Sequence, residues 1–372
     1  MTEHHFLDVS GAAIPGEPDY WDPVIFRRAQ IEAEVDRLAS IRQPDGGRRE
    51  SILVHPRSEP DAPALAPGIR VTLSVLLPGE RTRHIRHTST QVGFCIAGSG
   101  RVVIGSETIA FDRYDAWNHP SWRAYAYENT GAEPQVRLTY SNAPLLERLN
   151  VHLVQDVMEA PGAADPLAAA ADSNEDDARR ASPFGTFAIE GATAMLMPYE
   201  SLVNPPSVRS EALHWPWAIV KAHLDRLVAL GDDYVGRRLY LLYNPMTGRT
   251  NGTTPSLFAT LTIRPPGVVD RPHRHVSAAI NYFFGGSGWS RVGGRRYEWA
   301  AGDLMLAAPG WMIHNHASDD ERVYELTVQD QPFHLGNESL LWQEDLKEPA
   351  RVLGAESGFA TNRPDADRAV TA

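Results

Sequence analysis

The chain has 372 residues, of which 42% are hydrophobic and 22% charged, with a formal net charge of −12 at pH 7. These values are typical of a globular protein large enough for two domains, and the acidic balance argues against nucleic acid or an anionic membrane as a partner. The single cysteine, Cys95, excludes an intramolecular disulfide, and the absence of an apolar signal core near the start favours a cytoplasmic protein.

The first predicted element is an amphipathic helix over residues 22–41, which ends before the turn Pro44-Asp45-Gly46. Short apolar runs bounded by Gly, Pro and Asp predict strands at residues 71–77, 91–96, 101–104, 257–263, 278–284 and 324–328. Between these two groups, residues 159–177 predict a solvated helix or mobile loop, and residues 217–230 predict a helix that stops at Gly231. Residues 361–372 are expected to be frayed.

The two groups of strands belong to an internal repeat. Three segments recur at an offset of 188 or 189 residues: Gly47-Arg48-Arg49 as Gly236-Arg237-Arg238, Gly98-Ser99-Gly100 as Gly286-Ser287-Gly288, and Pro120-Ser121-Trp122 as Pro309-Gly310-Trp311. Several matches in order at nearly one offset are hard to obtain by chance. A repeat of roughly one hundred residues of short strands suits a small antiparallel barrel or jelly roll.

The sequence therefore predicts a mainly β protein with two jelly-roll β-barrels and a few short helices at the N-terminus and between the repeats. The expected divisions are an N-terminal helical segment at 1–45, a first barrel at 46–145, a linker and helix at 146–235, a second barrel at 236–335 and a C-terminal tail at 336–372.

A candidate metal site lies in the second repeat. His273 and His275 are two residues apart on a predicted strand, so their side chains share one face. His314 follows a Pro-Gly turn and can supply a third nitrogen from a neighbouring strand, with His316 pointing the same way. Three neutral imidazoles suit Fe, Zn, Cu or Ni and leave coordination positions open, as in a catalytic site.

The first repeat serves as an internal control. The positions of His273, His275 and His314 correspond there to Ile85, His87 and Tyr125. One imidazole cannot hold a divalent ion firmly, so the first barrel is expected to be metal-free. A site made from His84, His87 and His119 would need irregular backbone, because residues three apart lie on opposite strand faces.

Two segments resemble the cupin metal motifs of the gentisate 1,2-dioxygenase family, which includes salicylate and 1-hydroxy-2-naphthoate dioxygenases: His273-Arg274-His275-Val276-Ser277-Ala278-Ala279, and Pro309-Gly310-Trp311 with His314-Asn315-His316. The resemblance covers roughly residues 20–345. It implies a bicupin fold, a homo-oligomer (tetramer or dimer), and Fe(II) that uses O2 to open the ring of a hydroxylated aromatic acid.

The resemblance also implies roles for individual residues. His273, His275 and His314 match the metal ligands, and His316 matches a histidine that moves a proton beside them. Arg237 and Arg238 match arginines that steady the substrate anion; on a strand, only one of two successive residues should reach the pocket. Apart from the resemblance, Asn281 is expected to hydrogen-bond the substrate during catalysis. The aromatic residues Tyr282, Phe258 and Trp311 are expected either to line the pocket for its ring or to be part of the barrel core.

The sequence departs from the family in two respects. Family members commonly keep iron in the first cupin, whereas here the motif survives in the second. An arginine commonly found six residues after the second metal histidine is replaced by Asn281. A variant aromatic acid, such as a substituted salicylate, is therefore expected as the substrate in preference to gentisate itself. Two alternatives stay open: another cupin metalloenzyme, such as a decarboxylase or hydrolase with Mn, Ni or Zn, and a non-catalytic bicupin that binds a small molecule.

Overall fold

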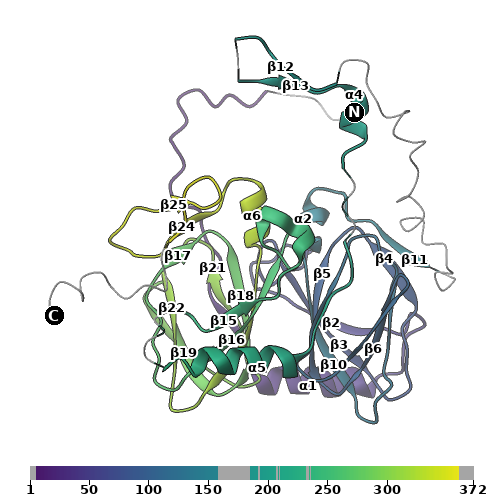
Figure 1. Cartoon of the computed structure of the whole chain (residues 1–372). Coiled ribbons are helices and arrows are strands. Elements are labelled where there is room, and N and C mark those ends of the chain that lie inside the picture. The colour runs from purple at the N-terminus through teal and green to yellow at the C-terminus, as the bar shows by residue number, and fades with distance from the viewer. Residues whose placement is uncertain are drawn as a thin grey trace.

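Two β-barrels stand side by side, and each is formed by one of the two sequence repeats (Figure 1). The computed structural model describes residues 6–157 and 185–359, except residues 192, 207, 209, 232, 233 and 235. The mainly β, two-barrel prediction is confirmed. The interpretations of residues 159–177 and 361–372 fall outside the described residues.

The first barrel has two antiparallel sheets. One has the order β14 (His214–Trp215), β8 (Ala116–His119), β5 (Gln91–Ala97), β10 (Gln135–Ser141), β3 (Arg70–Leu76) and β2 (Arg49–Leu53). The other has the order β11 (Val154–Val157), β4 (His84–His87), β9 (Tyr125–Glu128), β6 (Gly100–Ile104) and β7 (Glu107–Phe111).

The second barrel repeats this plan. Its large sheet has the order β1 (Val24–Phe26), β21 (Leu304–Pro309), β18 (Ala278–Gly285), β23 (Val323–Gln329), β16 (Phe258–Arg264) and β15 (Leu239–Leu241). Two three-stranded sheets complete it: β20 (Arg295–Ala300), β19 (Ser287–Val292) and β22 (His314–Ser318), and then β17 (Arg274–His275), β24 (Leu341–Gln343) and β25 (Arg351–Val352). The six predicted strands all form, within one residue at each end.

Repeated glycines mark equivalent turns in the two barrels. Gly98 and Gly286 have φ angles of 71° and 72°, in the left-handed region that favours glycine. A Cβ atom at either position would overlap the backbone carbonyl of Pro134 or Arg322, respectively. The internal repeat found in the sequence is thus a repeat of backbone geometry.

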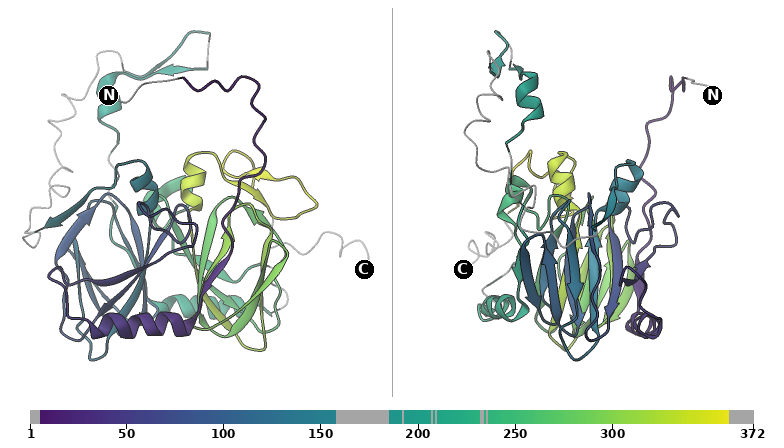
Figure 2. Two further views of the ribbon diagram at one scale, coloured as in Figure 1. Left: turned by 180° about the vertical axis from the view of Figure 1, so that it is seen from behind. Right: turned by 90° about the vertical axis from the view of Figure 1, so that its right-hand side faces the viewer.

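Segments outside the repeats cross between the barrels. Strand β1 pairs with β21 of the second barrel, and α1 (Arg28–Ser40) then runs against β2 and β3 of the first. Conversely, β14 pairs with β8 of the first barrel, and α5 (Trp217–Val228) then packs on β15 and β16 of the second. The predicted helix at 22–41 was wrong at its start, because residues 24–26 gain ladder hydrogen bonds from β21. The two helices lie on opposite sides of the barrels (Figure 2).

The two six-stranded sheets enclose a shared hydrophobic core, in which Phe94 of one barrel lies 5.5 Å, between ring centroids, from Phe284 of the other. On β16, β18 and β23, alternate side chains such as Leu261, Ile280 and Leu326 enter this core. The intervening side chains face the interior of the second barrel. Strand alternation therefore gives the same three strands an apolar face and a face available for chemistry.

Short elements cap the barrels. They are α2 (Ala143–Arg148), η2 (Pro245–Thr250) and α6 (Gln331–Gly336). A hairpin of β12 (Phe187–Ala188) and β13 (Met195–Leu196), followed by α4 (Tyr199–Val203), projects away from the barrels (Figures 1 and 2).

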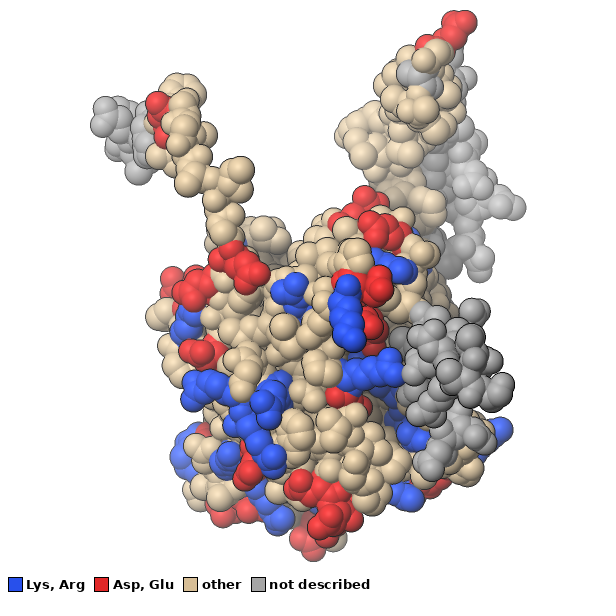
Figure 3. Space-filling model, turned by 90° about the vertical axis from the view of Figure 1, so that its left-hand side faces the viewer, with Lys and Arg blue, Asp and Glu red and all other residues tan. Residues whose placement is uncertain are grey.

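No helix in the described part of the chain is both long and apolar enough to cross a membrane. Basic and acidic side chains are interspersed over the face of the second barrel (Figure 3).

Candidate metal centre

His273, His275 and His314 converge in the second barrel. His273 and His314 form an antiparallel bridge, and His275 lies two residues beyond His273 on the same face. One ring nitrogen from each residue lies within 4.8 Å of the other two, and each residue is at most 4% exposed. In the described residues, these three form the one group of His, Cys, Asp or Glu side chains close enough to share a metal ion.

The backbone fixes the tautomer of all three rings. In each ring, Nδ1 lies 2.9–3.1 Å from a backbone carbonyl oxygen two residues away. A carbonyl oxygen can only accept a hydrogen bond, so Nδ1 carries the proton and Nε2 presents a lone pair. This is the arrangement that metal-binding histidines require.

Burial keeps the three rings neutral. It lowers the pKa of His275 to about 3 and places the pKa values of His273 and His314 well below the usual value, because a buried imidazolium loses its hydration. Protons therefore do not compete for the three lone pairs near neutral pH. The donor set fits a borderline divalent transition metal.

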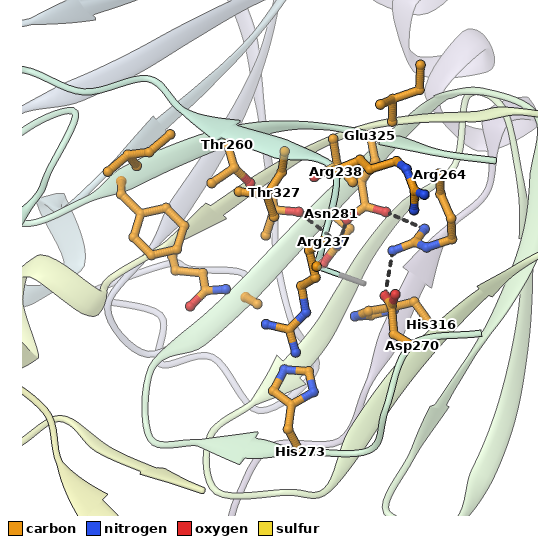
Figure 4. A pocket seen from close by; sticks show the side chains of 18 of the residues that line it. Arg237, Arg238, Thr260, Arg264, Asp270, His273, Asn281, His316, Glu325 and Thr327 are labelled. Atoms are coloured by element: carbon orange, nitrogen blue, oxygen red, sulfur yellow. Dashed lines mark hydrogen bonds and ion pairs between the residues drawn. The ribbon is translucent and has the colours of Figure 1, made fainter. Parts of the chain in front are cut away.

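A cavity of about 310 Å³ opens beside the three histidines. Figure 4 shows its wall next to His273. Its volume is in the range of small-molecule sites. Alternate residues of three strands line its wall: Phe258, Thr260, Thr262 and Arg264 of β16, Ala279 and Asn281 of β18, and Glu325, Thr327 and Gln329 of β23. These are the side chains on the opposite face from the shared core.

His316 and Asn281 both line this cavity. His316 follows His314 by two residues on β22, and their ring centroids are 5.9 Å apart. Its Nδ1 lies 2.7 Å from the hydroxyl of Ser290, which also accepts a hydrogen bond from the Trp299 indole at 2.9 Å. The ring of His316 is therefore held in place beside the triad without being part of it.

The two candidate arginines diverge. Arg237 points toward His273 (Figure 4), and its guanidinium is 3.3 Å from a carboxylate oxygen of Glu344. The guanidinium of Arg238 donates to the carbonyl oxygens of Gly231, at 2.8 Å, and Tyr234. Both residues contribute to the cavity wall, but Arg237 is the one directed at the histidines.

The two candidate aromatic residues also differ in position. Phe258 is buried and lines the cavity. Trp311 is absent from the cavity lining, and its ring instead lies under the guanidinium of Arg274 at 4.4 Å. Arg274 lies between His273 and His275 and so points away from the triad. The structure thus places Trp311 on the outer side of the strand that carries the ligands.

Sequence reasoning missed a buried ionic cluster in the wall. The guanidinium of Arg264 lies 2.9 Å from a carboxylate oxygen of Asp270 and 3.1 Å from one of Glu325. Burial opposes ionisation of Glu325, but the charge of Arg264 and the hydrogen bonds from Thr327 and Arg264 outweigh it, so its pKa lies below the usual value. A signal was present, since Thr260, Thr262 and Arg264 form a polar stripe of period two on a buried strand.

The C-terminal segment also belongs to the site. Strand β24 pairs with β17, which carries His275. The ring centroid of Trp342 lies 4.6 Å from that of His275 and 5.9 Å from that of His273. The Trp342 indole donates to Glu344 at 2.8 Å, and Glu344 in turn faces Arg237. Residues beyond 336, expected to be a tail, therefore cover the triad.

The equivalent place in the first barrel is closed by hydrogen bonding. Nδ1 of His87 lies 2.9 Å from the carbonyl oxygen of Ser89, so its Nε2 can accept, and the hydroxyl of Tyr125 donates to it at 3.1 Å. Tyr125 thus occupies the lone pair that a metal would need. At the position equivalent to Asn281, a Cβ atom on Gly93 would overlap the indole of Trp117. The Trp117 ring therefore occupies the space that a side chain at this position of the first barrel would need.

Comparisons with known proteins agree with this architecture. Residues 258–353 match the AraC-like ligand binding domain family. A 1-hydroxy-2-naphthoate 1,2-dioxygenase from Nocardioides sp. (strain KP7) is 24% identical over 327 residues, covering 86% of this chain and 77% of the relative. A gentisate 1,2-dioxygenase from Streptomyces sp. is 24% identical over 302 residues, covering 75% of this chain and 77% of the relative.

Among solved structures, a salicylate 1,2-dioxygenase from Pseudoaminobacter salicylatoxidans, in adducts with gentisate, superimposes with a TM-score of 0.70. It is 17% identical, and the match covers 90% of this chain and 88% of that one. The resemblance drawn from the histidine motifs is confirmed. The chain has a bicupin fold, and two relatives that match most of its length are a 1-hydroxy-2-naphthoate and a gentisate 1,2-dioxygenase.

Proposed function

We propose that this chain is an Fe(II)-dependent ring-cleaving dioxygenase that inserts O2 into a hydroxylated aromatic carboxylic acid of the gentisate or substituted-salicylate type. The observation that carries the proposal is the set of three Nε2 lone pairs, fixed by carbonyl contacts to Nδ1, beside a cavity of about 310 Å³. His273, His275 and His314 would hold the iron. Bound Fe(II) supplies a Lewis-acidic centre where the acid and O2 meet and through which electrons pass between them.

The charges around the cavity support an anionic substrate. The three ligands are neutral, so they leave the charge of the metal uncompensated. Arg237 is directed at His273 and shares its guanidinium with Glu344. A guanidinium has five N–H donors, so Arg237 keeps donors for a substrate carboxylate while Glu344 holds it in place.

Other residues of the cavity have distinct roles in this proposal. Phe258 gives the aromatic ring an apolar wall, and Trp342 covers His275 and His273 and excludes water. His316, held by Ser290, moves a proton to or from the reacting ring. Trp311, which lies on the outer side of β17, acts through Arg274 on the position of that strand.

We also propose that the chain forms a homo-oligomer, either a tetramer or a dimer. The projecting segment of β12, β13 and α4 carries exposed apolar side chains, including Phe187, Met195, Leu196 and Leu202. Exposed apolar side chains gathered in one segment are typical of an interface. Light scattering of the purified protein measures the mass directly, and a monomer at micromolar concentration would contradict this part of the proposal.

The function is tested by loading the protein with Fe(II) without air and then following O2 uptake. The panel of acids contains hydroxybenzoates, halosalicylates, nitrosalicylates and hydroxynaphthoates. We expect one O2 consumed per ring opened for at least one acid, and none for His314→Ala loaded in the same way. A filled iron site that consumes no O2 with any of these acids would refute the proposed activity.

A further inference from the structure

The amide group of Asn281, in the cavity wall, is only half satisfied in its hydrogen bonding. It is 1% exposed, and its Nδ2 donates to a carboxylate oxygen of Glu325 at 2.6 Å and to the hydroxyl of Thr327 at 3.1 Å. Its Oδ1 is buried and has no hydrogen-bond partner among the described residues. Figure 4 shows Asn281 in the cavity wall between Thr327 and Arg237.

The surrounding network fixes the orientation of this amide. The hydroxyl of Thr327 donates its one hydrogen to Glu325 at 2.8 Å, so toward Asn281 it can only accept. The other carboxylate oxygen of Glu325 accepts from Arg264 at 3.1 Å. A flipped amide would place Oδ1 against two acceptors and leave Nδ2 unbound. The oxygen is therefore the atom that Asn281 offers to the cavity.

A buried carbonyl oxygen without a hydrogen-bond partner lowers the stability of the fold. We therefore expect a bound molecule to supply the partner of this oxygen. The group that fills it must be a hydrogen-bond donor. The hydroxyl that chelates a metal gives up its proton and cannot serve, so the donor is a separate group on the ring. Glu325 and Asp270 lie in the same wall, and their charges disfavour a second carboxylate there.

We propose that Asn281 selects substrates with a hydrogen-bond donor on the aromatic ring, a hydroxyl or an amino group in addition to the chelating hydroxyl and carboxylate. This inference rests on the proposed function, because it takes the occupant of the cavity to be a hydroxylated aromatic acid. It makes Asn281 a specificity-determining residue whose carbonyl oxygen accepts a hydrogen bond from the ring substituent.

The test compares salicylates that carry a hydroxyl, an amino or a methyl group at each free ring position. Methyl matches the other two in size and lacks the donor. Dissociation constants are measured without O2 on the Fe(II)-loaded wild type, Asn281→Leu and Ile280→Val. Leucine keeps the size of asparagine and removes the acceptor, whereas Ile280 is the neighbouring side chain on the opposite face of β18, in the shared core. For each protein, the dissociation constant of the methyl compound is divided by that of the hydroxyl or amino compound. The effect of a substituent on ring acidity is the same for every protein, so it cancels when these ratios are compared between proteins.

At one ring position, we expect the hydroxyl and amino compounds to bind wild type about tenfold more tightly than the methyl compound, as one hydrogen bond to an otherwise unpaired group gives. Asn281→Leu should lose this preference, and Ile280→Val should keep it. Equal binding of methyl and donor compounds to wild type at every position, or an unchanged preference in Asn281→Leu, would overturn the inference. Failure of the proposed function is separate, because it appears as no O2 uptake with any acid, however tightly the acids bind.

Discussion

His273 and His314 exchange both backbone hydrogen bonds across an antiparallel bridge, at 3.1 and 2.9 Å, and their ring centroids lie 4.3 Å apart. The distance between these two candidate ligands is thus set by strand pairing, which does not depend on a bound ion. His275 joins them through strand alternation. The site is prepared by the backbone of the barrel, and we expect metal binding to change the fold little.

Replacing Ser277 tests whether the hydrogen-bond partner of a metal ligand affects the affinity for the metal. Its hydroxyl donates to Gln329 at 2.9 Å, so it can accept from Nδ1 of His275, also at 2.9 Å. Such partners orient a metal-bound histidine and raise its basicity. We expect Ser277→Ala to weaken Fe(II) binding about tenfold, measured by anaerobic competition with a chelator.

The chain offers a matched control for this variant. Ser89 makes the same contact with His87 in the first barrel, at 2.8 Å. If the metal is confined to the second barrel, Ser89→Ala leaves Fe(II) affinity unchanged. Equal weakening in both serine variants would show that the effect on Ser277 is not local to the metal.

Much of this fold could be predicted because the signals were local or repeated. The strand at residues 278–284 is a long apolar run, and the glycines at 98 and 286 recur because their turns need positive φ angles. The start of α1 was wrong because β1 is stabilised by β21, nearly 280 residues away, and no local pattern encodes such pairing.

The candidate site divides in the same way. Spacing brought His273 and His275 to one face, and that relationship needs only strand alternation. Trp342 covers them through the pairing of β24 with β17, and Trp311 is turned away by its packing on Arg274. Both facts depend on tertiary contacts between separate segments. Separation along the sequence from the histidine motifs therefore does not predict how near a residue lies to the three histidines in the structure.

The buried cluster of Arg264, Asp270 and Glu325 should be important for stability. Removing one partner of a buried ion pair leaves an uncompensated charge, and such changes typically cost about 3–5 kcal/mol. We expect Arg264→Met to lower the free energy of unfolding by about that amount, measured by urea denaturation.

Arg101 provides the exposed counterpart. It pairs with Glu128 at 2.7 Å, and the two side chains are 47% and 36% exposed. Arg101→Met should cost about 0–1 kcal/mol, because water screens this pair. Losses of equal size in the two arginine variants would mean that the Arg264 cluster contributes no more than a surface ion pair.

His87 should make the protein sensitive to acid. Burial lowers its pKa to about 4 from the ordinary 6.5, because the imidazolium cannot be hydrated there. Between these values the unfolded chain binds the extra proton and the folded chain does not. Stability therefore falls as the pH drops from 6.5 to 4, by about 3 kcal/mol from this residue in total.

The variant that isolates this effect is His87→Gln, which keeps an acceptor for Tyr125 and cannot be protonated. Urea unfolding at pH 7, 5.5 and 4 should show a smaller loss of stability in the variant than in wild type. Parallel losses in the two proteins would indicate that other groups account for the acid sensitivity.

One metal ion should bind in the second barrel and none in the first. The most direct test is iron content after anaerobic loading with Fe(II) and desalting, for wild type, His314→Ala and His87→Ala. We predict one iron per chain in wild type and in His87→Ala, and none in His314→Ala, with all three proteins folded by circular dichroism. Iron retained in His314→Ala but lost from His87→Ala would place the metal in the first barrel.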